Sequence, residues 1–127
     1  MRNKIRELTD RNKGISNAER ERKYREYVRG WVGYFRLADM KGLLKTTDEW
    51  ARRRIRAIYW KQWKRVRTRY RILRKLKLEH WQAIKFANSR CGYWRMAEML
   101  NTVITKSIIG KLGYTSMLDY YLTVCEN

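Results

Sequence analysis

Apolar residues recur at every third or fourth position along most of the chain, a spacing typical of amphipathic helices. The longest such stretch starts near Thr47 or Asp48, two residue types that cap helices. We expect its apolar stripe to be buried: Ala51, Ile55, Ile58, Tyr59, Val66, Tyr70 and Leu73. At about 100° per residue, a second set falls on the opposite side: Arg53, Arg56, Trp60, Lys64, Arg67, Arg71 and Arg74. The pattern predicts one long helix with a basic arc opposite a core stripe.

Shorter helices are expected before and after this one. Residues 4–10 resemble the end of a helix, and the turn RNKGIS leads to Ser16, which can cap a helix over residues 17–34. Glu19 has the position of the acidic residue in a capping box. Further helices are predicted over residues 78–88, over residues 93–109 and from Thr115 or Ser116 onward. The fold class is therefore an all-α bundle with one long basic helix followed by several shorter ones.

Two parts of this prediction have alternatives. The stretch RVRTRY (residues 65–70) contains two β-branched residues, so the long helix either continues through it or bends there. Residues 103–109 are also rich in β-branched side chains, so a short strand is the alternative to a helix there. The chain contains no proline, so helix ends must come from glycines and polar clusters.

Positive charge is concentrated in the first part of the chain. The formal net charge is +19, from 31 Lys and Arg against 12 Asp and Glu. Residues 1–77 contain 26 of these basic residues and 8 acidic ones, and residues 50–77 contain 13 basic residues and no acidic one. A helix that needed only solubility would mix both signs for pairing between successive turns. The exclusion of acid predicts a surface that faces the phosphates of a nucleic acid.

Aromatic residues accompany this charge, with six Trp and nine Tyr in the chain. Helical spacing places Trp31, Trp50, Tyr59 and Trp63 at core positions, whereas Trp60 falls on the basic arc, where it would stack on a base or pack internally. The motif NSRCGYWRMA offers a second basic and aromatic group that would contact RNA or pack the next helix. The residues predicted to bind RNA are Arg52, Arg53, Arg56, Trp60, Lys61, Lys64, Arg65, Arg67, Arg69, Arg71, Arg74, Lys75, Arg90, Tyr93, Trp94 and Arg95. The plain alternative is a solvated face whose arginine stems cover apolar surface.

The sequence offers no motif for catalysis, a metal or a cofactor. Cys91 and Cys125 lie far apart without a second ligand near either, so we expect free thiols. His80 is expected to be exposed or to cap a helix. No apolar run resembles a signal peptide or a membrane span, which predicts a cytoplasmic protein. The lack of a catalytic motif predicts that this chain is not an enzyme.

Three motifs together resemble the maturase-specific domain of bacterial group II intron reverse transcriptases. They are Tyr27–Tyr70, which includes RGWVGYFRLAD and DEWARRRIRAIYWKQWK, then ANSRCGYWRMA (Ala87–Ala97) and LGYTSMLDYY (Leu112–Tyr121). The resemblance covers about Ile5 to Tyr121. One departure is Val66, where relatives often carry a proline after WKQWK.

The resemblance implies a thumb-like helical domain, called domain X, which follows the fingers and palm of the polymerase. Such a domain binds structured intron RNA, assists ribozyme folding and splicing, and grips the template–primer during reverse transcription. It implies a single domain over residues 1–121, in which residues 1–16 continue from an upstream polymerase domain, and a tail over residues 122–127. The polymerase aspartates of the family are absent from this chain.

Two other classes of function fit the charge. One is a module that binds DNA or an RNA–DNA duplex without a role in splicing. The other is a helix that lies on an anionic membrane surface, although the apolar stripe is needed for the core.

Overall fold

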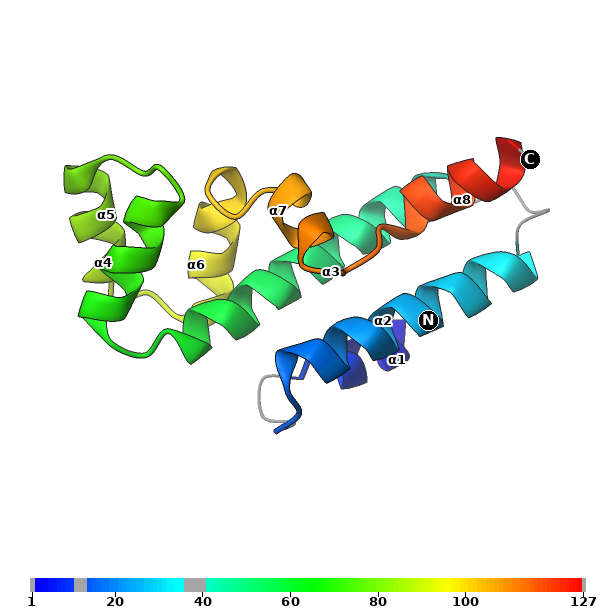
Figure 1. Cartoon of the computed structure of the whole chain (residues 1–127), viewed down its shortest axis with the longest axis horizontal. Helices are drawn as coiled ribbons and strands as arrows, with labels where there is room; N and C mark the ends of the chain where they lie inside the picture. Colours follow the sequence, from blue (N-terminus) through cyan, green and yellow to red (C-terminus); the bar gives the residue numbers. More distant parts are fainter. Residues whose placement is uncertain (1, 11–13, 36–40, 127) are drawn as a thin grey trace. The chain divides into compact units, whose positions relative to one another are not determined.

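A computed structural model describes residues 2–10, 14–35 and 41–126, without the side chains of residues 33–35 and 124–126. In this part of the chain every regular element is a helix, which confirms the all-α fold class (Figure 1). In chain order the elements are α1 (Arg2–Leu8), α2 (Asn17–Phe35), α3 (Lys41–Gln62), α4 (Val66–Lys75), α5 (His80–Ala87), α6 (Tyr93–Met99), the 3-10 helix η1 (Leu100–Thr102), α7 (Lys106–Lys111) and α8 (Met117–Glu126).

The chain divides into two compact units. The first comprises Met1–Arg52 and Ser107–Asn127, and the second comprises Arg53–Lys106. One boundary falls inside α3 and the other at the start of α7. No described helix is both long enough and apolar enough to cross a membrane.

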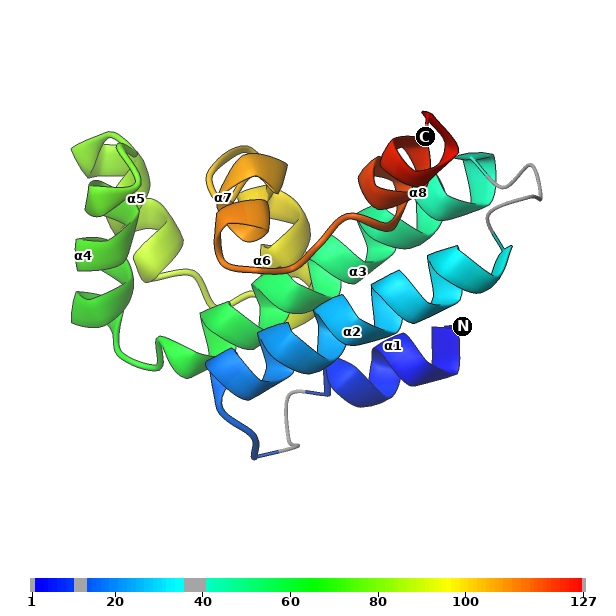
Figure 2. The same ribbon diagram turned by 45° about the vertical axis from the view of Figure 1, so that its right-hand side comes forward.

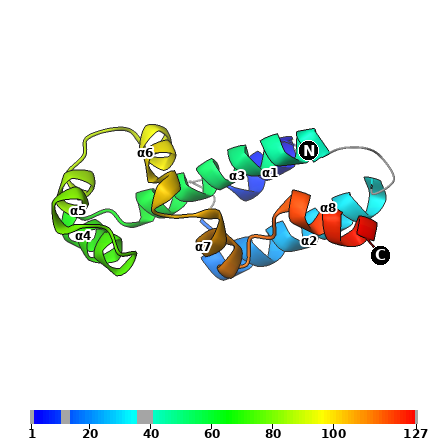
Figure 3. The same cartoon turned by 90° about the horizontal axis from the view of Figure 1, so that it is seen from above.

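In the first unit, α2 packs against α1 (Figure 2) and against α8 (Figure 3). The buried side of α2 carries Tyr24, Val28 and Val32, which are spaced by one helical turn each. The Ser16 cap is confirmed, because the Glu19 backbone N–H donates to the Ser16 hydroxyl at 3.1 Å. The core of this unit also contains residues from α1, α3 and α8: Ile5, Leu8, Leu44 and Met117.

The predicted cap of α3 is wrong. This helix begins at Lys41, so Thr47 and Asp48 lie within it and are both buried. Asp48 instead caps α8, because its carboxylate accepts hydrogen bonds from the backbone N–H groups of Met117 and Leu118, each at 2.9 Å. The Ser116 cap that we predicted for α8 is confirmed by its hydrogen bond from the Asp119 N–H at 3.3 Å.

In the second unit, α4 and α5 pack side by side (Figures 1 and 2). The long helix does not continue into α4, because α3 ends at Gln62 and α4 begins at Val66. Beyond this break the predicted apolar stripe is buried only in part. Val66 is 46% exposed and Tyr70 is half-buried, whereas Leu73 is fully buried. The core is formed by Ile55, Ile58, Trp60, Leu73, Ala83, Ala87, Met96 and Leu100.

The single helix predicted over residues 93–109 is also wrong, and so is the strand alternative. α6 ends at Met99, η1 follows, and α7 begins only at Lys106. The residues between them include the β-branched Val103 and Ile104, whose stiff side chains lower helix propensity. The Ile104 carbonyl accepts a hydrogen bond of 2.6 Å from the Arg56 guanidinium. In a continuous helix this carbonyl would instead accept from a backbone N–H of the next turn.

Of the aromatic residues predicted for the core, Tyr59 is buried, as expected. Trp31, Trp50 and Trp63 are half-buried. Trp50 is covered in part by cations, since the guanidinium carbons of Arg2 and Arg6 each lie 5.6 Å from its ring centroid. The three tryptophans therefore lie at the edge of the core and not inside it.

Candidate nucleic-acid interface

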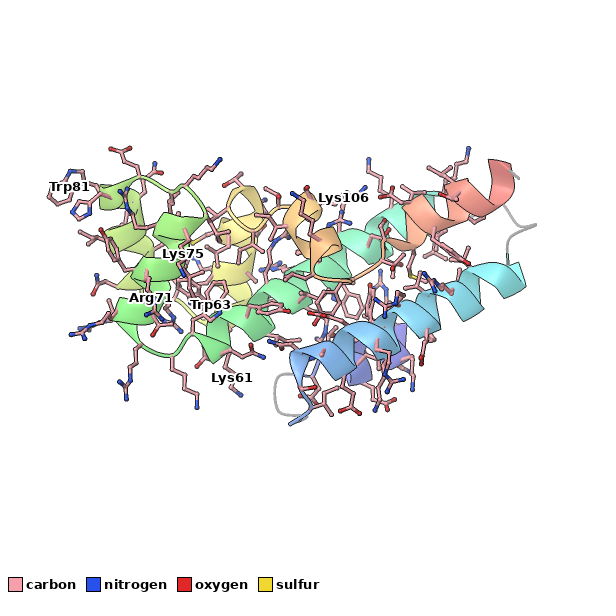
Figure 4. The ribbon with its side chains drawn as sticks, in the orientation of Figure 1. Lys61, Trp63, Arg71, Lys75, Trp81 and Lys106 are labelled. Carbon is pink, nitrogen blue, oxygen red and sulfur yellow. The ribbon has the colours of Figure 1, made fainter. Side chains whose placement is uncertain are left out.

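All exposed residues of α4 except Val66 are basic. Arg67, Arg71, Arg74 and Lys75 are exposed and fall within an arc of about 100° around the helix, whereas Leu73 is buried on the opposite side. Figure 4 shows Arg71 and Lys75 on this helix. The segment before the helix adds two more exposed cations. We refer to the set of six as the α4 basic surface: Lys64, Arg65, Arg67, Arg71, Arg74 and Lys75.

The α4 basic surface keeps its charges open to a ligand. Within the described part of the chain, none of its six side chains forms an ion pair with a carboxylate. Arg74 is held at one side, because its guanidinium donates to the Leu78 carbonyl at 3.3 Å. Guanidinium groups with free N–H donors match the geometry of phosphate oxygens.

The part of the predicted basic arc that lies on α3 is not exposed. Every residue from Ile55 to Trp60 is buried. The Arg56 guanidinium donates to the Ile104 carbonyl, and the Arg69 guanidinium lies over the Trp60 ring. Arg56 is only 6% exposed, and Trp60 is 1% exposed. The prediction that both face solvent is therefore wrong, and in this conformation the Trp60 ring is closed to a nucleic-acid base.

Arg53 is half-buried and held by α6. Its Nε donates to the Trp94 carbonyl at 3.0 Å, and its guanidinium carbon lies 3.9 Å from the Trp94 ring centroid. A second nitrogen lies 3.3 Å from the Glu98 carboxylate. Arg53 thus joins α3 to α6, and it covers one face of the Trp94 ring.

Arg69 stabilises the end of α3. It donates to the Trp60 carbonyl at 3.0 Å, and its guanidinium carbon lies 4.3 Å from the Trp60 ring centroid. The last carbonyls of a helix lack partners within the helix and attract positive charge. Burial lowers the pKa of Arg69 from its ordinary value. Its surroundings are those of a structural residue rather than of a phosphate contact.

The remaining predicted residues lie on α3, on α6 and in the segment before α6. Arg52 is half-buried in the first unit, whereas the α4 basic surface belongs to the second. Lys61 is half-buried near the end of α3. The group on and before α6 is exposed and offers two aromatic rings and two cations: Arg90, Tyr93, Trp94 and Arg95.

Trp81 is an exposed residue that the sequence prediction missed. Its side chain is 72% exposed on α5, and Figure 4 shows it pointing away from the helix. His80 beside it is exposed, as predicted, and its Nδ1 lies 2.6 Å from the Tyr70 hydroxyl. Helical phase could have found Trp81, because the buried positions Ala83 and Ala87 lie on the other side of α5.

Other chemistry is sparse in the described residues. They contain no group of three or more His, Cys, Asp or Glu side chains that could hold a metal ion. Cys91 is a free, half-buried thiol, as predicted, and the side chain of Cys125 lies outside the described set.

The described residues thus form an all-helical fold in which α4 carries a basic, solvent-facing surface. The family model of the group II intron maturase-specific domain matches residues 1–81. The match covers more than half of the chain, so the chain belongs to this family, a non-catalytic domain of maturases. It includes all six residues of the α4 basic surface and also Trp81, but not the group around α6. No curated protein matches the chain.

Proposed function

We propose that this chain binds structured group II intron RNA through the α4 basic surface and thereby assists the folding and splicing of the intron. The observation that carries the proposal is the surface of α4, where every exposed residue after Val66 is Lys or Arg. Family membership supports a maturase role and makes intron RNA the expected polyanion.

The proposed mechanism is electrostatic. A folded ribozyme brings phosphates close together, and a protein that neutralises them releases condensed counterions. Guanidinium groups on successive turns of α4 would bind phosphate oxygens in pairs, which fixes the protein on the RNA. The RNA itself then carries out the splicing reaction.

The proposal extends to the parent protein. There the domain would act as the thumb that grips the template–primer of a reverse transcriptase in the bacterial cytoplasm. The alternative is a module that binds DNA or an RNA–DNA duplex without a role in splicing. Competition separates the two, because an intron-specific surface should retain labelled intron RNA when excess plain duplex of equal length is added.

Charge reversal on α4 tests the proposed surface. The triple variant Arg67→Glu, Arg71→Glu and Lys75→Glu should bind intron RNA at least about 100-fold more weakly, because each lost charged contact contributes about 1.5–3 kcal/mol. Arg53 and Arg56 are left unchanged, since their side chains support the fold. Filter binding gives the affinity, and circular dichroism verifies the fold.

A matched control separates location from net charge. Arg29, Lys45 and Lys111 are exposed residues of the first unit, and their reversal to Glu changes the formal charge by the same amount. We expect this variant to lose much less affinity than the α4 variant. Equal losses in the two variants, or an unchanged affinity in the α4 variant, would contradict the proposed surface.

A further inference from the structure

Trp81 is the most exposed of the large apolar side chains in the described residues, at 72%. Its neighbours on the outer side of α5 are polar and exposed: Gln82, Lys85 and Asn88. One aromatic ring among polar side chains is a poor docking face for an apolar protein surface or for lipid, both of which need a continuous apolar stripe. It fits a ligand that combines a flat aromatic group with charge.

The indole contacts the His80 ring, which in turn contacts Tyr70 on α4. The Tyr70 hydroxyl on α4 lies 2.6 Å from His80 Nδ1, and the two rings meet edge to face with centroids 5.6 Å apart. The His80 and Trp81 ring centroids lie 5.1 Å apart at an interplanar angle of 69°. Because Trp81 is mostly exposed, at least one face of its ring meets solvent. Tyr70, His80 and Trp81 thus form a row of rings from α4 to α5 that ends in an open indole.

The α4 basic surface adjoins this row. Arg67 and Arg74 lie three residues before and four residues after Tyr70, on the same side of α4. The Arg74 guanidinium donates to the carbonyl of Leu78, which stands three residues before Trp81 in the segment that leads into α5. Cations and an open ring therefore occur together, which is the combination that binds the phosphates and the base of unpaired nucleotides.

We propose that Trp81 stacks on an unpaired base of the bound RNA, while Arg67 and Arg74 contact the phosphates beside that base. This inference rests on the proposed function and adds a recognition element to it. The preferred ligand is a bulged or loop purine, since the larger ring system stacks over more of the indole. A fully paired helix would meet only the cations.

Two RNAs with the same number of phosphates test this inference. One is an RNA hairpin with a single bulged adenosine, and the other carries an abasic nucleotide at that position. The wild-type chain should bind the first about tenfold more tightly, within the range measured for stacking of a base on an aromatic side chain. Trp81→Ala should remove this preference without changing the affinity for the abasic RNA.

Two further variants separate stacking from structure. Trp81→Phe should keep most of the preference because it retains a ring, and Gln82→Ala, an exposed neighbour, should keep all of it. With 2-aminopurine at the bulge, binding should quench the probe fluorescence in the wild type and much less in Trp81→Ala.

The possible results distinguish this inference from the proposed function. The wild type could bind both RNAs with equal affinity, and charge reversal of α4 could abolish binding to both. This result would overturn the stacking role and support the RNA-binding surface. A Trp81→Ala variant that weakens both RNAs equally would likewise overturn it. If the wild type binds neither these hairpins nor group II intron RNA, both proposals are overturned. If it binds intron RNA but neither hairpin, only the stacking inference is overturned. Binding to anionic phospholipid vesicles that needs Trp81, without any preference for the bulged RNA, would assign the ring to a membrane surface instead.

Discussion

The carboxylate of Asp48, inside α3, accepts a hydrogen bond of 2.9 Å from the backbone N–H of Met117, the first residue of α8. The same carboxylate accepts hydrogen bonds from the Leu118 N–H at 2.9 Å and from the Ser116 hydroxyl at 2.8 Å. These contacts satisfy N–H groups that a helix leaves without internal partners, and they place negative charge at the positive end of the helix. A buried carboxylate thus holds the start of a helix from 69 positions away in the chain.

Replacement of Asp48 by Ala should lower the free energy of unfolding by about 2–4 kcal/mol. The estimate combines the loss of a helix cap with the loss of charged hydrogen bonds in a buried place. Urea denaturation followed by circular dichroism measures it. Glu49→Ala is the matched control, because Glu49 is the exposed neighbour on the same helix. A loss no larger than in this control would show that α8 is held by its apolar contacts alone.

Tyr24 makes the stability of the first unit sensitive to alkaline pH. Burial raises the pKa of its hydroxyl above the ordinary value, and the nearby Asp48 carboxylate raises it further. The folded chain therefore keeps Tyr24 protonated, whereas the unfolded chain ionises it from about pH 10. The stability that Tyr24 contributes is complete below that pH and declines as the pH rises above it.

Tyr24→Phe should accordingly lose less stability between about pH 9 and about pH 11 than the wild type does. Chemical denaturation at several pH values gives the two curves. Parallel curves for wild type and Tyr24→Phe would rule out Tyr24 as the source of alkaline sensitivity.

Arg69 and Arg71 stand two positions apart and should respond oppositely to truncation. Arg69→Ala removes the hydrogen bond to the Trp60 carbonyl and the guanidinium over the Trp60 ring, so it should destabilise the fold by about 2–3 kcal/mol. Arg69→Lys should recover only part of this lost stability, because an ammonium group lacks the planar set of N–H donors of a guanidinium. Arg71→Ala, at an exposed site, should change stability by less than about 0.5 kcal/mol and instead weaken RNA binding. Thermal unfolding and filter binding on the same samples separate the two roles.

Local patterns were sufficient for much of the fold. The Ser16 and Ser116 caps and the helical periods predicted α2 and α8 because the determining contacts lie within a few residues. The role of Asp48 could not be found in this way. A residue suited to capping gives no sign of which helix it caps, and here its partner is distant in the chain.

The sequence predicted that the candidate site is basic, but it predicted only some of the residues that are exposed there. Periodicity assigned two opposite sides to the long helix, yet it cannot tell how many neighbours surround a given turn. At Arg56 and Trp60 the surrounding elements leave no open side, and the Ile104 carbonyl takes up the arginine. On α4, where one side faces solvent, the predicted cations Arg67, Arg71 and Arg74 are exposed as expected.

The salt dependence of RNA binding should report how many cations of the α4 basic surface meet phosphates. Each contact with duplex or single-stranded nucleic acid contributes about 0.7–0.9 to the slope of log affinity against log salt, so six contacts predict a slope of about −4 to −5. Arg71→Ala should make the slope shallower by about one contact, or about 0.7–0.9. Trp81→Ala should weaken binding of a bulged RNA and leave the slope unchanged, because stacking releases no counterions. A nearly flat wild-type slope would mean that rings, and not the cations of α4, hold the RNA.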